Sequence, residues 1–419
     1  MRFEGLSGRI YLVKSKIAKN TFFLSASQVL SRAIGFLYVI FLARVLGVRN
    51  FGIYSFTLAF VYNFIPVADF GIERLVLRDV SRDLGKASFY LSRLLPLRLA
   101  LALGAYVLVL LLALGLGQDS QQIFYLAIFG LALIPYSLTF LFSSFLNAKE
   151  KMKYMAFANI MQISLTALFG GMFVFLKLGL VWILLAYPLA NFLTAGTFVL
   201  KARKWGLPLG WRIDISFWKE KLSQSWIFAT FTIISVFYLR ISLILVNFFH
   251  GPEATGLYGA PFKFLEAMIL IPQSVALALF PLSSQLFSED KQRLRSIYKK
   301  GLGFQFFSSL IFISPLIFFP SSILTLAYGR EYLSAAPVFP ILGIALIFFF
   351  INSLAGNVIH NSPQVKKFLP FLLLNLTVKI TLCLLLIPNW SIIGAAWAVA
   401  AAESFGFLIN NYFVWRVLK

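Results

Sequence analysis

The sequence predicts an all-α polytopic membrane protein with twelve transmembrane helices in two six-helix lobes, and three observations support this prediction. Hydrophobic residues make up 60% of the 419 residues and charged residues 12%, a composition outside the range of soluble globular proteins. Apolar runs of about 20 residues, long enough to span a bilayer, recur along the whole chain. Lys and Arg gather at the ends of these runs, so the formal charge of +22 indicates membrane orientation rather than nucleic-acid binding.

Each apolar run is expected to form a helix, because a helix satisfies its own backbone groups in hydrocarbon. Gly, Pro and polar clusters separate the runs. The expected helices cover residues 20–46, 51–72, 89–114, 122–146, 155–176, 180–200, 224–249, 258–286, 301–328, 335–359, 368–387 and 391–415. Residues 201–222 are an expected cytoplasmic interfacial linker rich in Trp and Lys, between an N-terminal lobe (1–200) and a C-terminal lobe (223–419).

The distribution of cations predicts which side of the membrane each connection occupies. The two termini and every second connection carry 28 Lys and Arg residues, whereas the opposite side carries only 4. Positively charged loops remain on the cytoplasmic side. Both termini are therefore expected in the cytoplasm, and the protein in the cell membrane.

The two lobes share a short pattern that predicts an internal repeat. Gly47, Gly52 and Tyr54 align with residues of the same type 204 positions later, at Gly251, Gly256 and Tyr258. Six helices per half would give both copies the same orientation, as in transporters built from two parallel lobes. Chance matching of Gly and Tyr in outer turns is the alternative.

The first expected helix carries a charge at membrane depth. Arg32 lies about 18 Å along a helix that starts at Asn20, close to the bilayer midplane. A guanidinium there costs at least ~2.5 kcal/mol, so it should face protein, water or a ligand. A polar stripe at helical spacing includes Arg32 and is expected to line a central cationic cavity. The stripe consists of Ser25, Gln28, Arg32, Gly35 and Tyr38.

Further ionisable side chains fall within or near the expected helices. They are the cations Arg98, Arg240, Lys263 and Lys379 and the acids Asp69, Glu266 and Glu403. Because the cations outnumber the acids, the cavity should attract phosphate, whose oxygens suit arginine forks. The predicted substrate-binding residues are Arg32, Arg98, Arg240, Lys263, Lys379 and Gln28.

Structural roles are the alternatives for several of these residues. Arg98 could extend toward the cytoplasmic face. Lys263 and Glu266, three apart on one helix, could pair with each other. Lys379, with Asn375 one turn earlier, could hold helices together.

The interior acids are candidates for ion coupling, with a proton or a monovalent cation as the ion. They are Asp69, Glu266 and Glu403. For Asp69, which lies near the cytoplasmic end of its helix, pairing with Arg74 or Arg78 is the alternative.

No catalytic or metal-binding pattern is present in the sequence. Phosphate-binding glycine loops, His-Glu-x-x-His and the nucleophile elbow are all missing. His250 and His360 have no companions suited to a metal, and a lone Cys383 excludes a disulfide framework. The chain is therefore expected to be a non-enzyme without a cofactor and without its own ATPase.

Short motifs in a fixed order resemble the polysaccharide transporter family. They are SRAIGF at 31–36, LARVLG at 42–47, NFGIY at 50–54, DFGI at 69–72, GLY at 256–258, IP at 271–272, FPL at 280–282 and IGAA at 393–396. The best-known members of this family are the bacterial O-antigen flippases. Lipid II flippases and multidrug and toxin extrusion antiporters belong to the same superfamily, that of multidrug/oligosaccharidyl-lipid/polysaccharide flippases (MOP).

The resemblance implies two six-helix lobes around a central cavity and transport by alternating access. The implied substrate is a polyprenyl-diphosphate-linked oligosaccharide, and the Ser-Arg-x-x-Gly-Phe pattern implies that Arg32 contacts its diphosphate. The implied partners are membrane lipids, glycan polymerase and glycosyltransferases, and no nucleic acid. Ser242 stands where many relatives are expected to have an acid, which argues against carrying over an ion-coupling role to this helix.

Three other functions are the alternatives. A lipid II flippase shares the Arg32 pattern but usually has two further helices, for which 419 residues leave no room. A multidrug antiporter should contain buried acids rather than buried cations. A membrane-embedded glycosyltransferase or ligase normally needs a sizeable outer loop, and the outer connections of this chain are short.

Overall fold

The chain is helical and divides into two compact units. The computed structural model describes residues 4–207, 209–362 and 364–419, with the backbone alone for residues 4–25. Unit 1 comprises Met1–Val39 and Phe60–Ile233, and unit 2 comprises Ile40–Ala59 and Ile234–Lys419. Helices α1 and α9 therefore contribute residues to both units.

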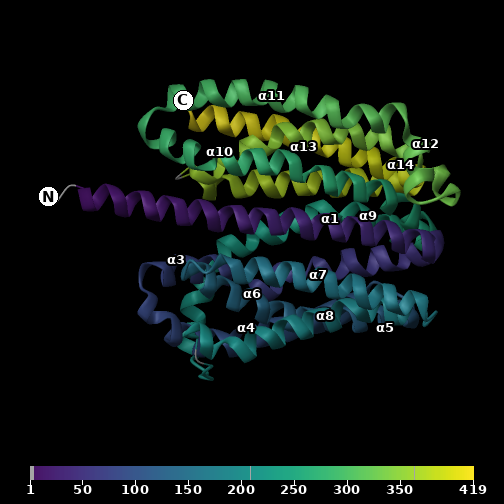
Figure 1. The fold of residues 1–419 in the computed structure, drawn as a ribbon. Helices are drawn as coiled ribbons and strands as arrows, with labels where there is room; N and C mark the ends of the chain where they lie inside the picture. Colours follow the sequence, from purple (N-terminus) through teal and green to yellow (C-terminus); the bar gives the residue numbers. More distant parts are fainter. Residues whose placement is uncertain (1–3, 208, 363) are drawn as a thin grey trace. The chain divides into compact units, whose positions relative to one another are not determined.

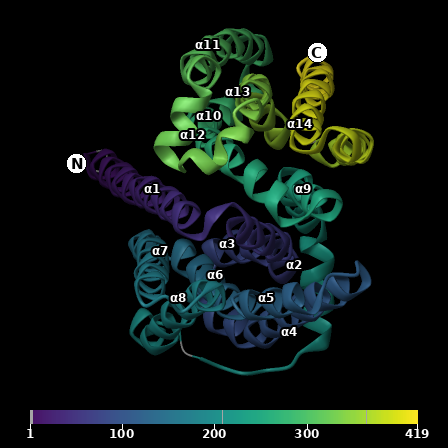
Figure 2. The ribbon, with the colours of Figure 1, turned by 90° about the vertical axis from the view of Figure 1, so that its right-hand side faces the viewer.

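Unit 1 is a bundle in which α6 contacts α3, α4 and α8 (Figures 1 and 2). Its helices are the first part of α1 (Glu4–Tyr62), α2 (Ile65–Asp69), α3 (Ile72–Arg82), α4 (Ala87–Gly115), α5 (Ser120–Gly130), α6 (Leu133–Ala148), α7 (Met152–Phe175), α8 (Leu180–Lys201) and the start of α9 (Ile215–Met268). The core includes Phe142 of α6 and Phe198 of α8, with Trp205 packed edge-on against Phe198 at 5.1 Å. Aromatic burial of this kind stabilises the bundle and orders the start of the linker.

Unit 2 is organised around α13. Its further helices are α10 (Leu270–Glu289), α11 (Lys291–Phe318), α12 (Pro320–Ala327), α13 (Val338–Asn361) and α14 (Leu369–Val417). The sequence of α13 is apolar on all sides, which is typical of a helix surrounded by other helices. It packs against α10, α11 and α14.

Nine helices in the described part of the chain are long and apolar enough to cross a membrane. The prediction of an all-α multi-pass membrane protein is therefore confirmed. Three of the nine cover 57, 75 and 53 residues, well beyond the ~20 residues that one crossing needs. Each of these three contains a residue with non-helical backbone angles, at Gly47, Gly251 and Ser391 respectively.

Gly47 and Gly251 have nearly the same backbone conformation. Gly47 has φ 68° and ψ 172°, and Gly251 has φ 75° and ψ −170°. Residues with a Cβ rarely adopt this region, because it is accessible almost only to glycine. The two glycines therefore allow α1 and α9 to change direction in the same way.

Beyond these bends the two helices touch backbone to backbone within unit 2. A Cβ atom at Gly52 would lie 1.7 Å from the carbonyl oxygen of Pro252, and one at Gly256 would lie 2.0 Å from that of Val48. The contact is reciprocal, since Pro252 and Gly256 each stand 204 positions after Val48 and Gly52. Only glycine leaves room for this approach.

The close contact predicts that Gly52→Ala and Gly256→Ala each destabilise the protein, by roughly 1–3 kcal/mol as for other overpacked cores. The measurement is the unfolding temperature of the purified protein in detergent. Gly104→Ala in α4 is the matched control, because a Cβ there meets nothing within 4 Å. An unfolding temperature for Gly52→Ala equal to that of the control would contradict the backbone contact.

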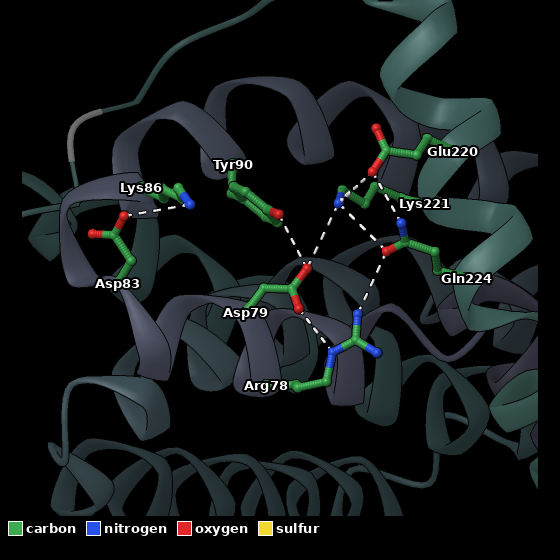
Figure 3. A network of polar contacts seen from close by, with 8 residues as sticks. All are labelled: Arg78, Asp79, Asp83, Lys86, Tyr90, Glu220, Lys221 and Gln224. Carbon is green, nitrogen blue, oxygen red and sulfur yellow. Dashed lines mark hydrogen bonds and ion pairs between the residues drawn. The ribbon is translucent and has the colours of Figure 1, made fainter.

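A polar network in unit 1 joins the start of α9 to α3 and α4 (Figure 3). The Asp79 carboxylate accepts hydrogen bonds from Arg78 Nε at 2.8 Å and from the Tyr90 hydroxyl at 3.0 Å. Lys221 of α9 lies 3.6 Å from the same carboxylate and also approaches the Tyr90 ring. Lys221 is 5% exposed, so its charge is satisfied within the protein.

A second set of contacts fixes the end of the linker to α4. Asp214 accepts the backbone N–H of Phe217 at 3.0 Å and so caps the N-terminus of α9. Its other oxygen accepts Arg93 Nε at 2.9 Å, and Trp218 Nε1 donates to the Arg93 carbonyl at 2.8 Å. The Phe217 amide and the Arg93 guanidinium lower the pKa of Asp214.

The lowered pKa of Asp214 predicts that acid loosens the start of α9. The folded state favours the carboxylate, so its stabilising contribution is complete above the unfolded-state pKa of about 3.9 and is lost as pH falls through the folded-state value. The protection factors of the amides around Phe217, which are exchange rates relative to the intrinsic rate at the same pH, should fall at low pH in the wild type. In Asp214→Asn the acid-dependent part of this change should vanish, and its persistence would refute the assignment.

Candidate substrate-binding site

Arg32 is the exposed cation of the predicted set. It lies on α1, in unit 1, with its side chain exposed, and it has no ion-pair partner among the residues that the structure describes. Gln28, one turn earlier, is half-buried. The N–H donors of the guanidinium are therefore not paired with a described carboxylate and can bind a ligand.

Other members of the predicted polar stripe contact α7 instead. A methyl group at Gly35 would lie 3.4 Å from Ile163, and the Tyr38 hydroxyl sits where a Cβ at Gly170 would be. Tyr38 is 7% exposed. These two positions pack α1 onto α7, and the side chain of Ser25 lies outside the described residues.

Arg98 of α4 is sealed inside unit 1 by Asp69. The guanidinium pairs with the Asp69 carboxylate and also donates to the carbonyls of Ala68 at 3.2 Å and Ser137 at 3.1 Å. Arg98 is 1% exposed, so it does not extend to the surface. Asp69 also accepts the backbone N–H of Gly71 at 3.0 Å, so this acid pairs with Arg98 rather than with Arg74 or Arg78.

In unit 2, Arg240 and Lys263 both pair with the carboxylate of Glu266, and we call these three residues the triad. Glu266 Oε1 lies 3.1 Å from Arg240 Nη1, and Glu266 Oε2 lies 2.6 Å from Lys263 Nζ. The pairing of Lys263 with Glu266 is confirmed, whereas Arg240 is a second partner that local spacing did not predict. The side chains are 13–17% exposed, and the triad carries a formal charge of +1.

Lys379 of α14 is fully buried in unit 2. Its Nζ lies 4.0 Å from the centre of the Tyr238 ring, and it has no hydrogen-bond partner among the described residues. Glu403 interacts with it electrostatically, while Asn352 donates to Glu403 Oε2 at 3.4 Å. A cation–π contact and a nearby carboxylate together offset part of the cost of burying this ammonium group.

Ser242 and His250 make contacts within the protein. The buried Ser242 hydroxyl accepts from the Tyr258 hydroxyl at 3.1 Å, and His250 Nε2 contacts the Ile387 carbonyl at 2.8 Å. Within the described part of the chain, no group of three or more His, Cys, Asp or Glu residues could hold a metal ion.

The predicted residues thus fall into two groups by accessibility. Arg32 and the triad of Arg240, Lys263 and Glu266 are exposed or partly exposed, whereas Arg98 and Lys379 are enclosed. The sequence did not reveal Tyr238 as the partner of Lys379, because the two lie on α9 and α14, far apart in the chain.

The buried ion pair of Arg98 and Asp69 predicts that Arg98→Met destabilises the protein. Removing one partner leaves a buried charge uncompensated, which costs roughly 3–5 kcal/mol. Folded protein yield and unfolding temperature should fall in Arg98→Met and recover in part in the double variant Arg98→Met with Asp69→Asn. An Arg98→Met protein as stable as the wild type would show that the pair is not structural.

Two solved structures of membrane transporters have a fold similar to that of this chain. The lipid II flippase MurJ, in an inward closed conformation, matches with a TM-score of 0.75 and 16% identity, over 93% of this chain and 87% of that one. An inward-facing multidrug resistance MATE family transporter of the MOP superfamily matches with a TM-score of 0.73 and 12% identity, over 92% and 95%. The chain therefore has the fold of the MOP superfamily transporters.

The sequence comparisons place the chain more narrowly. A family model described as polysaccharide biosynthesis protein matches residues 17–287. The chain therefore belongs to this family, which confirms the resemblance predicted from the short motifs.

Two curated relatives are archaeal. The probable low-salt glycan biosynthesis flippase Agl15 of Haloferax volcanii is 23% identical over 95% of this chain and 83% of its own length. An uncharacterized membrane protein of Methanocaldococcus jannaschii is 32% identical over 35% of this chain and only 28% of its own length. The relatives of described function are flippases or transporters rather than catalytic enzymes, in agreement with the prediction of a non-enzyme.

Proposed function

We propose that this chain is a flippase that moves a polyprenyl-diphosphate-linked oligosaccharide, such as an O-antigen or another surface glycan unit, across the cell membrane. The observation that carries the proposal is family membership over residues 17–287. The glycan flippase described for the relative from Haloferax volcanii supports it. Arg32 and the net positive triad of Arg240, Lys263 and Glu266 support an anionic cargo.

The diphosphate is the part of such a cargo that a membrane cavity must accommodate. Arg32 provides planar donors that suit phosphate oxygens and has no competing carboxylate among the described residues. The Arg240, Lys263 and Glu266 triad adds one further net positive charge. Gln28, Arg98 and Lys379 complete the proposed substrate-binding set, the latter two only after a rearrangement that uncovers them.

We also propose twelve crossings in two six-helix lobes, residues 1–200 and 223–419, related by an internal repeat around a cationic cavity. The division of each over-long span at Gly47, Gly251 and Ser391 supports this count. The matched conformations of Gly47 and Gly251 and the reciprocal contact at Gly52 and Gly256 support the repeat.

Transport in this proposal proceeds by alternating access, with both termini in the cytoplasm of the cell that makes the glycan. The cation count on alternate connections supports this orientation. The proposed coupling acids are Asp69, Glu266 and Glu403, with a proton or a monovalent cation as the ion. Glycosyltransferases and a glycan polymerase would supply the cargo and consume it.

The role of Arg32 predicts that Arg32→Ala lowers glycan export roughly 10- to 100-fold, because one charge-assisted interaction contributes about 1.5–3 kcal/mol. Surface glycan would be measured in cells that depend on this transporter, at matched protein level. Arg32→Lys should retain part of the activity. Arg49→Gln is the control and should retain all of it, because Arg49 is exposed and lies between the expected helices 20–46 and 51–72. Normal export by Arg32→Ala would overturn the role.

The substrate class is tested in vesicles. Purified protein should translocate a polyprenyl-diphosphate oligosaccharide faster than lipid II or a cationic drug. Faster transport of lipid II would favour a lipid II flippase, whose fold this chain shares, and faster transport of the drug would favour a multidrug antiporter.

A further inference from the structure

The linker between α8 and α9 exposes an alternating row of apolar side chains. Leu209, Trp211, Ile213 and Ile215 are 42%, 59%, 66% and 60% exposed. Residues 209–214 are neither helix nor strand, and Ile215 is the first residue of α9. We call residues 209–215 the interfacial strap, and the four exposed apolar side chains at every second position its apolar edge.

The opposite edge of the strap is fixed to α4 of unit 1. Gly210 lies so close to Ser92 that a Cβ there would be 2.7 Å from the Ser92 Cβ. The Arg212 amide donates to the Ser92 carbonyl at 2.9 Å, and Asp214 pairs with Arg93. The apolar edge is thus held facing outward by contacts on the other side.

The strap connects two membrane-spanning helices, so it lies at the boundary of the membrane. It begins shortly after α8 ends at Lys201 and leads into α9 at Ile215, and both helices are apolar enough to span a bilayer. Figure 2 shows the linker passing along the outer side of α4. Residues 209–214 lack the regular backbone hydrogen bonds of a helix or a strand, so the strap belongs at the headgroup level, with only side chains entering the acyl region.

The charges around the strap are complementary to an anionic surface. One exposed cation, Arg212, lies within it, and others flank it at Lys201, Arg203, Lys204 and Lys219. The acid within it, Asp214, is already paired with Arg93. Tryptophan beside basic residues is typical of segments at a lipid interface.

We propose that the interfacial strap binds the anionic lipid headgroup layer and holds this edge of unit 1 in the membrane surface. The occupant of the apolar edge is lipid rather than another protein. This interaction lies outside the proposed transport reaction, because it concerns the surrounding membrane and not the cargo.

The test uses one fluorescent label in vesicles of phosphatidylglycerol and phosphatidylcholine. Because Cys383 is the single cysteine and is buried, Trp211→Cys in a Cys383→Ser background directs a bimane label to the strap. Gln292→Cys, exposed at the start of α11, is the matched control. The expected result is at least threefold stronger quenching by nitroxide-labelled lipid at position 211 than at 292, with the reverse order for aqueous iodide.

Iodide quenching at position 211 equal to that at 292 would overturn the proposal. Protection of position 211 from both quenchers would also overturn it, because it would show that protein covers the apolar edge. A second measurement does not depend on the label. Anionic vesicles should raise the unfolding temperature of the wild type more than that of Trp211→Ser with Ile213→Ser, while the two proteins unfold at similar temperatures in detergent. Equal lipid stabilisation would contradict lipid binding by the strap, whatever the outcome of the transport assays.

Discussion

The cost of placing charge in hydrocarbon governs this structure. Each cation within a span must be offset by a carboxylate, an aromatic ring, water or a ligand. Arg98 has Asp69, Arg240 and Lys263 share Glu266, and Lys379 has Tyr238 and Glu403. Arg32 differs because the described residues give it no such partner. The distribution of these partners, rather than the number of cations, separates the structural charges from the one best suited to bind a phosphate.

Backbone geometry provides a second constraint. Helices separated by glycine alone approach more closely than side chains normally allow, and the contact between Gly52 and Gly256 depends on this. Around it, the hydroxyls of Tyr328 and Tyr332 donate to the carbonyls of Ala260 and Ala43, at 3.1 and 2.9 Å. The bends at Gly47 and Gly251 leave each helix free to enter this contact at the same angle. Small residues and buried tyrosines thus shape the crossing, together with Arg44, which donates to the carbonyls of Leu326 and Ala327.

The sequence predicted the helical membrane fold and the family well, because long apolar runs and ordered motifs are local signals. It offered the pairing of Lys263 with Glu266 as an alternative to substrate binding, since three positions on one helix bring side chains together, and the structure has this pair. It could not predict the partner of Arg98, because Asp69 lies 29 positions away on another helix. It likewise assigned Gly35 and Tyr38 to a cavity wall, whereas both pack on α7, because helical spacing identifies a stripe but not the element that covers it.

The burial of Lys379 also has a consequence for how the chain is made. A lysine in the middle of a span opposes insertion by about 2.5–3.5 kcal/mol on the mildest scale. The carboxylate of Glu403 lies 24 positions further along the chain, in the next stretch to leave the ribosome. Until that stretch is synthesised, the ammonium group lacks its counter-charge, and the apolar residues around it must favour insertion without that help. The first half of α14 thus depends on the second half for the charge that offsets its buried lysine.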